Sequence, residues 1–516
     1  MPWVQATRVA VRNSPYFHTL LRARWRVRRA LSGLTVHFTG ARLELIDDDA
    51  TERRFLARLG KRRQVDQPVV SLVLPTFNLI QLTRRCLASI AANTPLEITE
   101  IIVVDDCSTD ETPSVLSALN GITYLRNETN LGFLRTVNRG AAAARGEFIV
   151  ILNNDTQMQP GWLDTLLEAA RPHDVGAVGS KFVYPDGVLQ EAGGIVWADA
   201  SAWNYGKFQN PSAPEYEFRR EVDYCSAASL MMRRALFEQL GRFDTRYVPI
   251  YYEDADICFA IRESGYRVLY EPRSVVVHYE GMTHGTDTRR VSIGEHSKES
   301  QRLNQARFAE KWSEKLSRHR PNGTANGLMG GLRQDRARVL VVKTPAMLDG
   351  SRGADARLRS FVEGLAGVRC DVTLFLVAGV RRPAYVRRLQ VRGVEVVYGL
   401  RSFRRFAKQR AGLYDAVVIT NPTILAPLMP LIRRRFPGAT IVFHLSLPSR
   451  LRRTLMMRAD IITTDTDHHA QQLRADALAK HVLALPGGTM DGDPQRLGEV
   501  GHLLELIPSR VSLTAG

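Results

Sequence analysis

The amino-acid sequence predicts an α/β fold with two successive domains, and three observations support that prediction. Short apolar runs alternate with amphipathic stretches from residue 69 to about residue 315, and a second series of this kind begins at residue 338. Between them, residues 316–337 contain Pro321, Gly323 and several further glycines, as is typical of a linker. Alternation of this kind is typical of a parallel sheet that helices cover on both faces.

The composition agrees with a globular protein of two or three domains. The chain of 516 residues is 44% hydrophobic and contains 70 lysines and arginines against 53 acidic residues, so its formal charge is +17. That excess suits nucleic acid, anionic lipid surfaces or phosphorylated substrates, and the charge alone does not choose among them. The five cysteines are odd in number and include no CxxC pair, which indicates a reducing compartment and disfavours a structural zinc site.

The sequence predicts a cytoplasmic protein. It contains no uninterrupted apolar stretch of the ~18 residues that a membrane-spanning helix needs, and its first residues lack the apolar core of a signal peptide. Residues 1–66 are predicted to form a basic helical region, with apolar positions such as Trp3 and Trp25 among the arginines. Such a helix can lie on the inner face of the plasma membrane as a peripheral contact, or pack on the neighbouring domain, and both interpretations stay open.

The order of elements in the first domain follows from its hydrophobic pattern. We expect strands at residues 69–74, 101–104, 122–125 and 148–152, and helices at residues 81–92, 135–145 and 162–170. No G-x-G-x-x-G sequence follows the first strand, so a dinucleotide-binding fold of Rossmann type is not supported in this domain.

Polar residues follow three of these strands: Thr76 and Asn78, then Asp105 and Asp106, then Asn154 and Asp155. Because ligands of α/β sheets collect beyond the carboxyl ends of the strands, these three loops together predict a ligand crevice. A carboxylate such as Asp155 suits a hard cation, Mg²⁺ or Mn²⁺, which can in turn hold a diphosphate. The alternative is a polar turn in which Asp155 or Thr156 caps the helix at residues 162–170.

A second group of polar residues lies further along the chain. Glu253, Asp254 and Asp256 stand at the start of a helix predicted at residues 257–264, and His278 follows a strand predicted at residues 274–277. Clustered carboxylates titrate together, so one of them can become a general base, although acidic residues also stabilise a helix start without any catalytic role. For His278 a structural role is the alternative, and for Lys207, Arg219 and Arg220 contact with an acceptor phosphate competes with simple solvation.

Several segments in this order resemble the successive signatures of family 2 glycosyltransferases, which have the GT-A fold: residues 75–78, 103–110, 152–156, 222–228, 240–244 and 252–258. The resemblance covers about residues 69–315, so a GT-A domain is expected at residues 67–315. It implies that Pro75, Thr76, Asn78, Asp105, Asp106 and Asn154 bind the nucleotide sugar, with Asp106 reaching the base. It also implies that Asp155 and His278 bind a divalent metal ion, that Asp254 is the base, and that Glu253 and Asp256 orient either this base or the acceptor.

The resemblance departs from the family at one position, because Asn153 replaces the first acidic residue of the DxD element and leaves the site one negative charge poorer. The Asn-Asn-Asp form resembles rhamnosyltransferases of O-antigen and cell-wall biosynthesis. The resemblance therefore implies an inverting glycosyltransferase that uses a dTDP or UDP sugar, dTDP-rhamnose being favoured, and a glycan or lipid-linked glycan acceptor. The sequence does not settle the sugar or the acceptor.

A competing hypothesis is a non-catalytic basic scaffold that binds nucleic acid or a membrane surface on a transferase-like frame. Its support is the charge of the chain. The arginine clusters, however, lack a recognition motif or a regular pattern of stacking aromatic residues, so no nucleic acid is expected as a partner.

Residues 338–516 resemble the N-terminal, Rossmann-like half of a family 4 glycosyltransferase of GT-B fold. Strands are expected at residues 338–342, 372–377, 394–397, 416–420, 440–444 and 460–464. The loop at residues 350–353 could cradle a phosphate, and residues 485–488 resemble the segment that leads into the second half of such an enzyme. We expect this domain to bind an acceptor, a partner or a membrane rather than to catalyse.

Overall fold

A computed structural model describes residues 43–62, 65–279, 291–322, 336–343, 354–368, 370–377, 383–397, 403–420, 422–445, 459–464, 470–471, 481–484, 503 and 505–507. The chain divides into two compact units, residues 1–216 with 220–331 (unit 1) and residues 217–219 with 332–516 (unit 2). Most of the predicted N-terminal region and of the predicted linker lies outside the described residues, as do the loops at residues 350–353 and 485–488.

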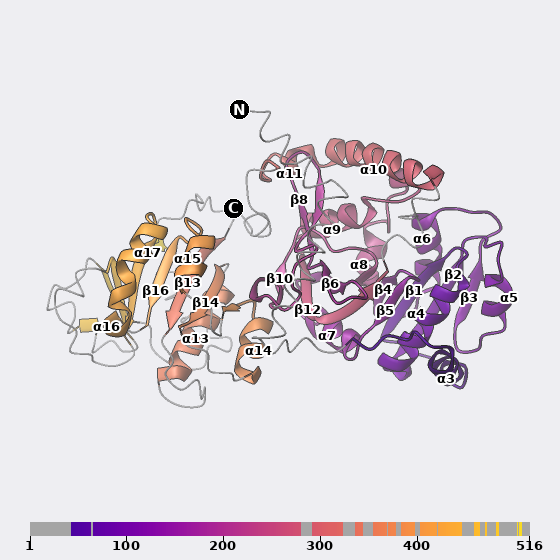
Figure 1. Cartoon of the computed structure of the whole chain (residues 1–516). Coiled ribbons are helices and arrows are strands. Elements are labelled where there is room, and N and C mark those ends of the chain that lie inside the picture. Colours follow the sequence, from indigo (N-terminus) through magenta and orange to yellow (C-terminus); the bar gives the residue numbers. More distant parts are fainter. Residues whose placement is uncertain are drawn as a thin grey trace. The chain divides into compact units, whose positions relative to one another are not determined.

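The first half of unit 1 is a parallel sheet (Figure 1). Its strands are β1 (Val70–Thr76), β2 (Thr99–Asp105), β3 (Thr123–Arg126) and β4 (Phe148–Leu152). Every residue of β1, β2 and β4 is buried, which explains their continuous apolar runs. All four strands overlap their predicted positions.

Helices cover both faces of this sheet, as predicted. Helix α4 (Ile80–Asn93) packs on Leu72 and Leu74 of β1, whereas α6 (Phe133–Ala143) packs on Val73, and alternate residues of a strand point to opposite faces. The short helix α5 (Thr112–Ser117) connects β2 to β3.

The rest of the sheet is mixed, whereas the parallel arrangement predicted for the first four strands is confirmed. The strand order is β10-β12-β6-β11-β4-β1-β2-β3, and β11 (Ser229–Arg233) runs antiparallel to both β4 and β6 (Val175–Val183). Between β6 and β11 the described chain forms the short strands β7 (Leu189–Glu191), β8 (Gly194–Val196), β9 (Ala202–Asn204) and β10 (Arg220–Glu221). Because these strands replace a crossover helix, β11 enters the sheet in the opposite direction.

Strand β5 (Thr156–Met158) was not predicted, and it lies between β4 and α7 (Trp162–Ala170). It pairs antiparallel with the end of β12 (Arg267–His278), with Thr156 opposite His278. The N-cap of α7 is Gly161, which makes no side-chain capping bond. The alternative in which Asp155 or Thr156 caps that helix is therefore wrong.

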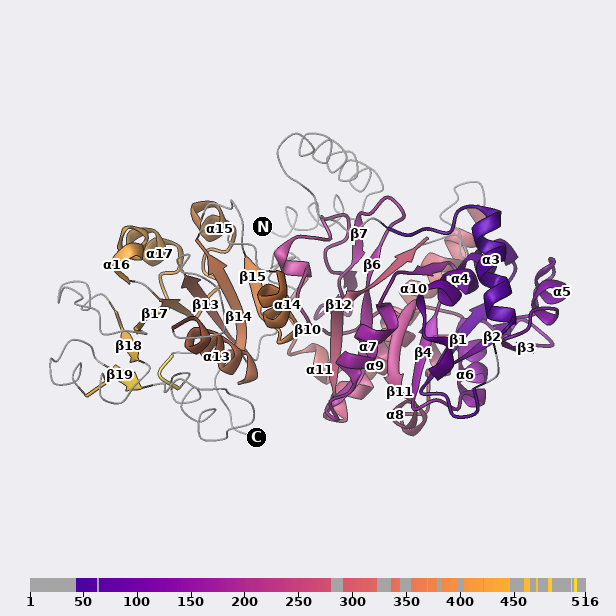
Figure 2. The ribbon, with the colours of Figure 1, turned by 90° about the horizontal axis from the view of Figure 1, so that it is seen from below.

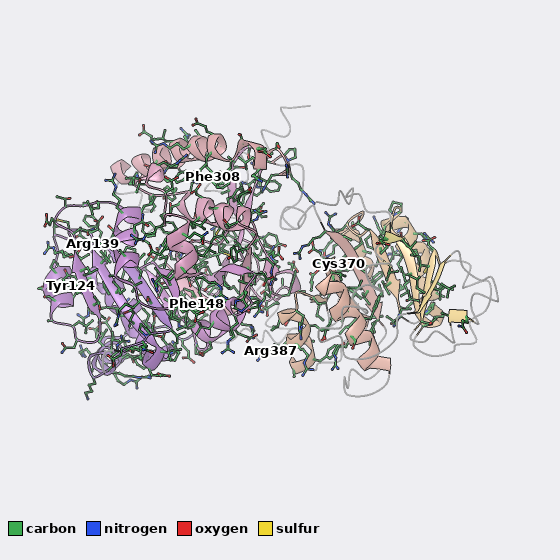
Figure 3. The ribbon with its side chains drawn as sticks, turned by 180° about the vertical axis from the view of Figure 1, so that it is seen from behind. Tyr124, Arg139, Phe148, Phe308, Cys370 and Arg387 are labelled. Atoms are coloured by element: carbon green, nitrogen blue, oxygen red, sulfur yellow. The ribbon has the colours of Figure 1, made fainter. Side chains whose placement is uncertain are left out.

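The remaining helices of unit 1 surround this frame: α3 (Asp49–Gly60), α8 (Arg234–Gln239), α9 (Glu253–Glu263), α10 (Val291–Lys311) and α11 (Ser313–Leu316). Helix α9 starts four residues before its predicted start, so the acidic residues form its first turn. Phe308 of α10, labelled in Figure 3, is buried against Tyr252 and Phe259 and so holds α10 on α9.

Unit 2 contains a seven-stranded parallel sheet in the order β15-β14-β13-β16-β17-β18-β19. The strands are β13 (Ala337–Lys343), β14 (Cys370–Leu376), β15 (Glu395–Val397), β16 (Ala416–Ile419), β17 (Thr440–Leu445), β18 (Ile461–Thr464) and β19 (His481–Ala484). The first six were predicted. β19 was not, because the apolar run at residues 482–485 is short.

Helices cover both faces of the second sheet as well (Figure 2). Helices α13 (Ala354–Gly367) and α14 (Pro383–Val391) share one core cluster with Leu374 of β14. On the opposite face, Phe375 of the same strand packs against α15 (Phe403–Gln409). Helix α16 (Pro422–Leu425) and α17 (Met429–Arg435) follow β16. Within the described part of both units, no helix combines the length and apolar character needed to cross a membrane.

We expect the central strand β1 to be intolerant of lost volume. Leu72 is 0% exposed, so Leu72→Ala should lower the free energy of unfolding of unit 1 by about 2–5 kcal/mol through lost burial and a residual cavity. The same change at Leu303, which is 51% exposed on α10, is the matched control and should have little effect. Denaturant titration of both variants measures the difference, and equal destabilisation would contradict the assignment of β1 to the core.

Candidate active site

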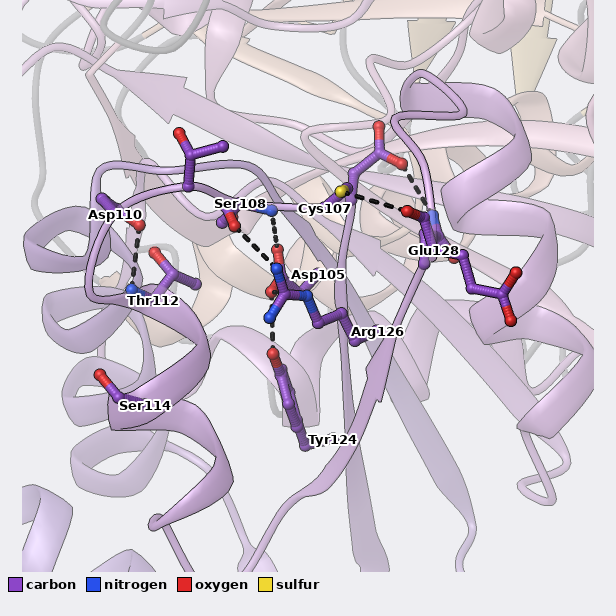
Figure 4. A network of polar contacts seen from close by, with 12 residues as sticks. Asp105, Cys107, Ser108, Asp110, Thr112, Ser114, Tyr124, Arg126 and Glu128 are labelled. Atoms are coloured by element: carbon purple, nitrogen blue, oxygen red, sulfur yellow. Dashed lines mark hydrogen bonds and ion pairs between the residues drawn. The ribbon is translucent and has the colours of Figure 1, made fainter.

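The carboxylate of Asp105 holds the loop after β2. Its Oδ1 accepts a hydrogen bond from the backbone N–H of Ser108 (2.8 Å) and its Oδ2 accepts one from the Tyr124 hydroxyl (2.8 Å). The guanidinium of Arg126 lies 3.7 Å from the same Oδ2 (Figure 4). Burial and this hydrogen bond raise the pKa of Tyr124. Both carboxylate oxygens of Asp105 thus stabilise the loop, and its predicted contact with the nucleotide stays a prediction.

Asn78 ties the loop after β1 to the loop after β2. Its Oδ1 accepts hydrogen bonds from the backbone N–H groups of Thr109 (2.7 Å) and Asp110 (3.3 Å), and its own N–H donates to Ser108 Oγ (2.7 Å). Asn78 has a φ of 54°, in the left-handed region that asparagine tolerates better than most residues. The two predicted nucleotide-binding loops are therefore joined by these three hydrogen bonds.

Asp106 fixes a third loop, between β3 and α6. Its Oδ1 accepts hydrogen bonds from Asn127 Nδ2 (2.7 Å) and from the N–H of Leu131 (2.8 Å), while Oδ2 accepts one from the N–H of Gly132 (2.9 Å). Gly132 is the N-cap of α6 and has a φ of 79°. A contact of Asp106 with the base stays a prediction, and what the geometry establishes is an anchor for the start of α6.

Asn154 and Thr76 meet inside the protein. Asn154 Nδ2 donates to Thr76 Oγ1 (3.2 Å) and to Thr83 Oγ1 (3.0 Å) of α4, and all three residues are buried. Pro75 is also buried, within β1 and opposite Val104 of β2. The structure thus brings the six predicted nucleotide-binding residues to one edge of the sheet, but it uses many of their polar atoms to set the shape of that edge.

The predicted metal ligands lie side by side because β5 pairs with β12. His278 Nε2 is 3.3 Å from Asp155 Oδ1, and His278 Nδ1 is 3.2 Å from Oε1 of Gln190 on β7. Within the described residues, no group of three or more His, Cys, Asp and Glu side chains could hold a metal ion. A pair of protein ligands nevertheless fits Mg²⁺ or Mn²⁺, since such ions usually complete their shell with water and substrate phosphates.

A third oxygen nearby in the sequence belongs to Asn153, which replaces the first acidic residue of the DxD element. Its Oδ1 is buried and has no hydrogen-bond partner among the described residues. A buried amide oxygen left without a partner costs stability, so such atoms call for an explanation. A neutral oxygen ligand for a hard cation is one explanation that the chemistry allows.

Asp254 lies in the first turn of α9. Its Oδ2 accepts a hydrogen bond from the N–H of Ala227 (3.4 Å) and its Oδ1 accepts one from the N–H of Ala255 (2.8 Å). Burial raises its pKa to about 6. The N-cap of α9 is Tyr252, which makes no side-chain capping bond, so none of the three acids is the N-cap residue.

The other two acids of this turn have different surroundings. Burial and the neighbouring Asp254 raise the pKa of Glu253 well above its ordinary value, and Glu253 Oε2 has no hydrogen-bond partner among the described residues. Asp256 instead accepts hydrogen bonds from Trp312 Nε1 (2.7 Å), Lys311 Nζ (2.8 Å) and the Tyr247 hydroxyl (3.0 Å). Asp256 is therefore an anchor for the end of α10, and its predicted role in orienting the base stays a prediction.

Sequence reasoning missed Gln190 and Glu191, which β7 places between the two halves of the site. Glu191 is 3% exposed, and its Oε1 accepts a hydrogen bond from the N–H of Ser226 (3.2 Å), the residue before the one that donates to Asp254. Burial, and then the charge of Asp254, raise the pKa of Glu191 to about 7. The available signal was a charged residue in a short apolar run that ends in two glycines.

The basic residues considered for an acceptor phosphate have separate positions. Arg220 lies over the rings of Tyr205 (4.1 Å) and Tyr270 (5.5 Å) and donates to the carbonyl of Ala192, which is a structural role. Lys207 lies 5.6 Å from the ring centroid of Phe208, and its charge lowers the pKa of Glu191. Arg219 falls in the segment 217–219 that is grouped with unit 2.

Comparison with known proteins gives a consistent result. Residues 71–241 match the family described as "Glycosyl transferase family 2". The chain is 29% identical over 230 residues to the O-antigen biosynthesis protein RfbC of Myxococcus xanthus. The alignment covers 43% of this chain and 18% of that protein. The chain is also 29% identical over 247 residues to N-acetylglucosaminyl-diphospho-decaprenol L-rhamnosyltransferase of Mycobacterium tuberculosis. This alignment covers 42% of this chain and 78% of that protein.

Among solved structures, the mannosyltransferase PcManGT of Pyrobaculum calidifontis, in complex with GDP-Man and Mn²⁺, is 22% identical over 47% of this chain and 66% of its own, with a TM-score of 0.32. The chain spans less than a fifth of the length of the Myxococcus relative. The resemblance of residues 338–516 to family 4 stays a prediction. The α/β fold of GT-A type predicted for unit 1 is confirmed, and the chain contains a family 2 glycosyltransferase domain.

Proposed function

We propose that the protein transfers a sugar from a nucleoside diphosphate donor to a hydroxyl of a glycan or lipid-linked glycan, with inversion at the anomeric carbon. The observation that carries this proposal is the connection of two half-sites by β7, since Gln190 contacts His278 and Glu191 shares the loop at residues 226–227 with Asp254. One half-site has the chemistry to hold a diphosphate through a cation, and the other has the chemistry of a base.

The names of the relatives support a place for this reaction in the synthesis of a cell-surface polysaccharide. One is named for O-antigen biosynthesis, and the other for the transfer of L-rhamnose to a decaprenol-linked acceptor. The second name agrees with a rhamnose donor. We therefore take dTDP-rhamnose as the first choice of donor and a UDP sugar as the second.

At the donor end, Asp155 and His278 are the residues that would hold Mg²⁺ or Mn²⁺ together with the diphosphate. Such a cation stabilises the negative charge that develops on a departing diphosphate. The loops that Asp105, Asp106 and Asn78 fix would hold the nucleotide by their backbone groups. Because hydrogen bonds within the protein already fix those loops, little ordering cost would remain for donor binding.

At the acceptor end, Asp254 is the proposed base. Its pKa of about 6 leaves it mostly ionised at neutral pH, yet it is more basic than an ordinary exposed carboxylate. As the acceptor oxygen bonds to the anomeric carbon, its proton passes to Asp254 and the bond from that carbon to the diphosphate breaks. Glu191 would tune the base through its charge, and Glu253 would keep solvent away from it by remaining buried.

Replacement of the base should separate binding from turnover. Asp254→Asn should lower kcat by about 10²–10⁴-fold while donor binding is retained, because the amide cannot accept the proton. In the unchanged protein, kcat/KM should rise with pH through about 6, where Asp254 loses its proton. Asp164→Asn, an exposed position on α7, is the matched control. Near-normal turnover of Asp254→Asn would show that another group is the base.

The buried acid Glu191 should make stability depend on pH. Its folded-state pKa of about 7 lies above its ordinary value, so above pH 4.5 the unfolded chain releases a proton that the folded protein retains. Stability contributed by the protonated form is therefore lost as pH rises from about 4.5 to about 7. Each unit of pKa shift corresponds to about 1.4 kcal/mol.

Between pH 5 and pH 8, the free energy of unfolding should therefore fall less for Glu191→Gln than for the unchanged protein. The expected difference is ~1–3 kcal/mol. Chemical denaturation at several pH values measures this difference and needs no substrate. Glu128→Gln, at an exposed position of unit 1, is the control and should leave the pH dependence unchanged. Parallel pH dependence for Glu191→Gln and the unchanged protein would mean that Glu191 is not a buried acid of raised pKa.

A thermal-shift panel with dTDP, UDP, GDP, CMP and ADP, each with Mn²⁺, Mg²⁺ or EDTA, tests the donor class. A nucleotide at 100 times its dissociation constant should add ~2.7 kcal/mol of stability. We expect a metal-dependent shift for dTDP or UDP that Asp155→Asn removes and Asp164→Asn leaves intact. If no nucleotide shifts the transition, the proposal fails in favour of a non-catalytic scaffold.

A further inference from the structure

Most of the excess positive charge belongs to unit 2. Residues 332–516 contain 29 lysines and arginines but only 15 acidic residues, a difference of +14 within the total of +17. The family 2 domain does not account for this charge, because residues 1–331 are close to neutral. The charge of unit 2 therefore needs an explanation separate from the binding of a nucleotide sugar.

Part of this charge forms one surface, which we call the basic face: Arg404, Arg405 and Lys408 of α15 with Arg433 and Arg434 of α17. All five side chains are exposed, and α15 and α17 contact each other (Figures 1 and 2). Neither helix contains an acidic residue. Arg433 pairs with Asp460 at 3.3 Å, and the other four make no ion pair with any residue that the structure describes.

The packing of the two helices sets the direction of these cations. Phe403 and Phe406 of α15 lie against Phe375 of the sheet, with ring centroids 5.1 Å and 4.8 Å away. At the end of α17, Phe436 packs on Tyr414 at 5.4 Å. Because the buried residues of each helix, the phenylalanines of α15 and Met429 and Ile432 of α17, form its inner side, the arginines and the lysine occupy the opposite, outer side.

This arrangement costs stability rather than adding to it. Arg404 and Lys408 are four residues apart on one helix, where like charges repel each other. An ordinary solvated helix face mixes both signs of charge, and this face carries only one. A surface that keeps such repulsion is best explained by a polyanionic partner that relieves it.

Apolar groups border the cations. Pro427 and Pro430 are exposed, and Leu428 and Leu431 are half-buried, in the 3-10 helix Ala426–Leu428 and the first turn of α17. Leu431 lies three residues before Arg434, so the two share one side of α17. Cations beside partly exposed apolar side chains match the boundary between lipid headgroups and acyl chains.

We propose that the basic face docks onto the surface of a bilayer that contains anionic phospholipids. Guanidinium groups bind headgroup phosphates in pairs of hydrogen bonds, while Leu428 and Leu431 contact the acyl boundary. Nucleic acid is the less suitable partner, because Phe403 and Phe406 of α15 and Phe436 after α17 are all buried and so are not exposed for stacking on bases. This docking is independent of the proposed transferase activity.

Sedimentation of the full chain with vesicles tests the docking. We expect binding to vesicles of phosphatidylcholine with about 40% phosphatidylglycerol, little binding to phosphatidylcholine alone, and loss of binding at about 0.5 M salt. The triple variant R404Q/R405Q/R434Q should bind at least about tenfold more weakly. The variant R404K/R405K/R434K, which keeps the charge, should retain most of the binding.

The matched control removes the same number of charges from α14 and the residue that follows it, since α14 packs on the opposite face of the sheet. It is R387Q/R388Q/R392Q, and Arg387 is labelled in Figure 3. This variant should bind within about twofold of the unchanged protein. Equal losses in the two glutamine variants would overturn the assignment to the basic face. Equal binding to both kinds of vesicle would overturn the need for anionic lipid. Displacement from vesicles by duplex or single-stranded DNA at equal phosphate concentration would identify nucleic acid as the partner instead.

Discussion

The pairing of β5 with β12 is the constraint on which the candidate site depends. β5 has only three residues, yet its register places Thr156 opposite His278 and so brings Asp155 to the end of a strand more than 110 residues later in the chain. β12 is itself fixed by its long parallel pairing with β6. Because a shift of one residue in a strand would turn every side chain to the other face, this register is strongly specified by the buried residues around it.

Around this pairing, the site divides its acidic residues between two uses. Asp105, Asp106 and Asp256 each accept two or more hydrogen bonds from neighbouring elements, so they fix loops and helices. Glu191 and Glu253 are buried and Asp254 is partly buried, and no side chain among the described residues donates a hydrogen bond to any of the three, so burial raises the pKa of each. Burial disfavours the charged form of a carboxylate that has few hydrogen-bond donors. Such a group therefore binds a proton more tightly than an exposed carboxylate does.

Much of the fold followed from sequence because β1, β2 and β4 are continuous apolar runs that end in polar residues, and the helices between them have regular apolar spacing. The antiparallel entry of β11 could not be predicted, because strand direction depends on the connection and the residues from 189 to 204 form strands of three. β5 was missed because Thr156, Gln157 and Met158 show no hydrophobic pattern.

The structure brings the predicted site residues together, and their roles stay predictions. The residues after the strands do gather at one edge of the sheet, which topology alone requires. Their individual contacts depend on loop geometry that no local pattern encodes: Asn154 donates to two threonines, and Asp106 accepts from the start of α6. Glu191 was not predicted as a site residue, because its contact with the loop at residues 226–227 depends on the position of β7 in the folded protein.

The hydrogen bonds of Asp256 determine how far the chain must extend for the first turn of α9 to keep its position. The sequence match to family 2 stops at residue 241, but Asp254 lies beyond it, and the first turn of α9 is tied through Asp256 to Lys311 and Trp312. Removing α10 and α11 would leave Asp256 with only the Tyr247 hydroxyl among these donors, and Phe308 would no longer brace Tyr252. The smallest fragment expected to keep the acidic turn in place therefore extends to Leu316, some seventy-five residues past the last residue that the family model matches.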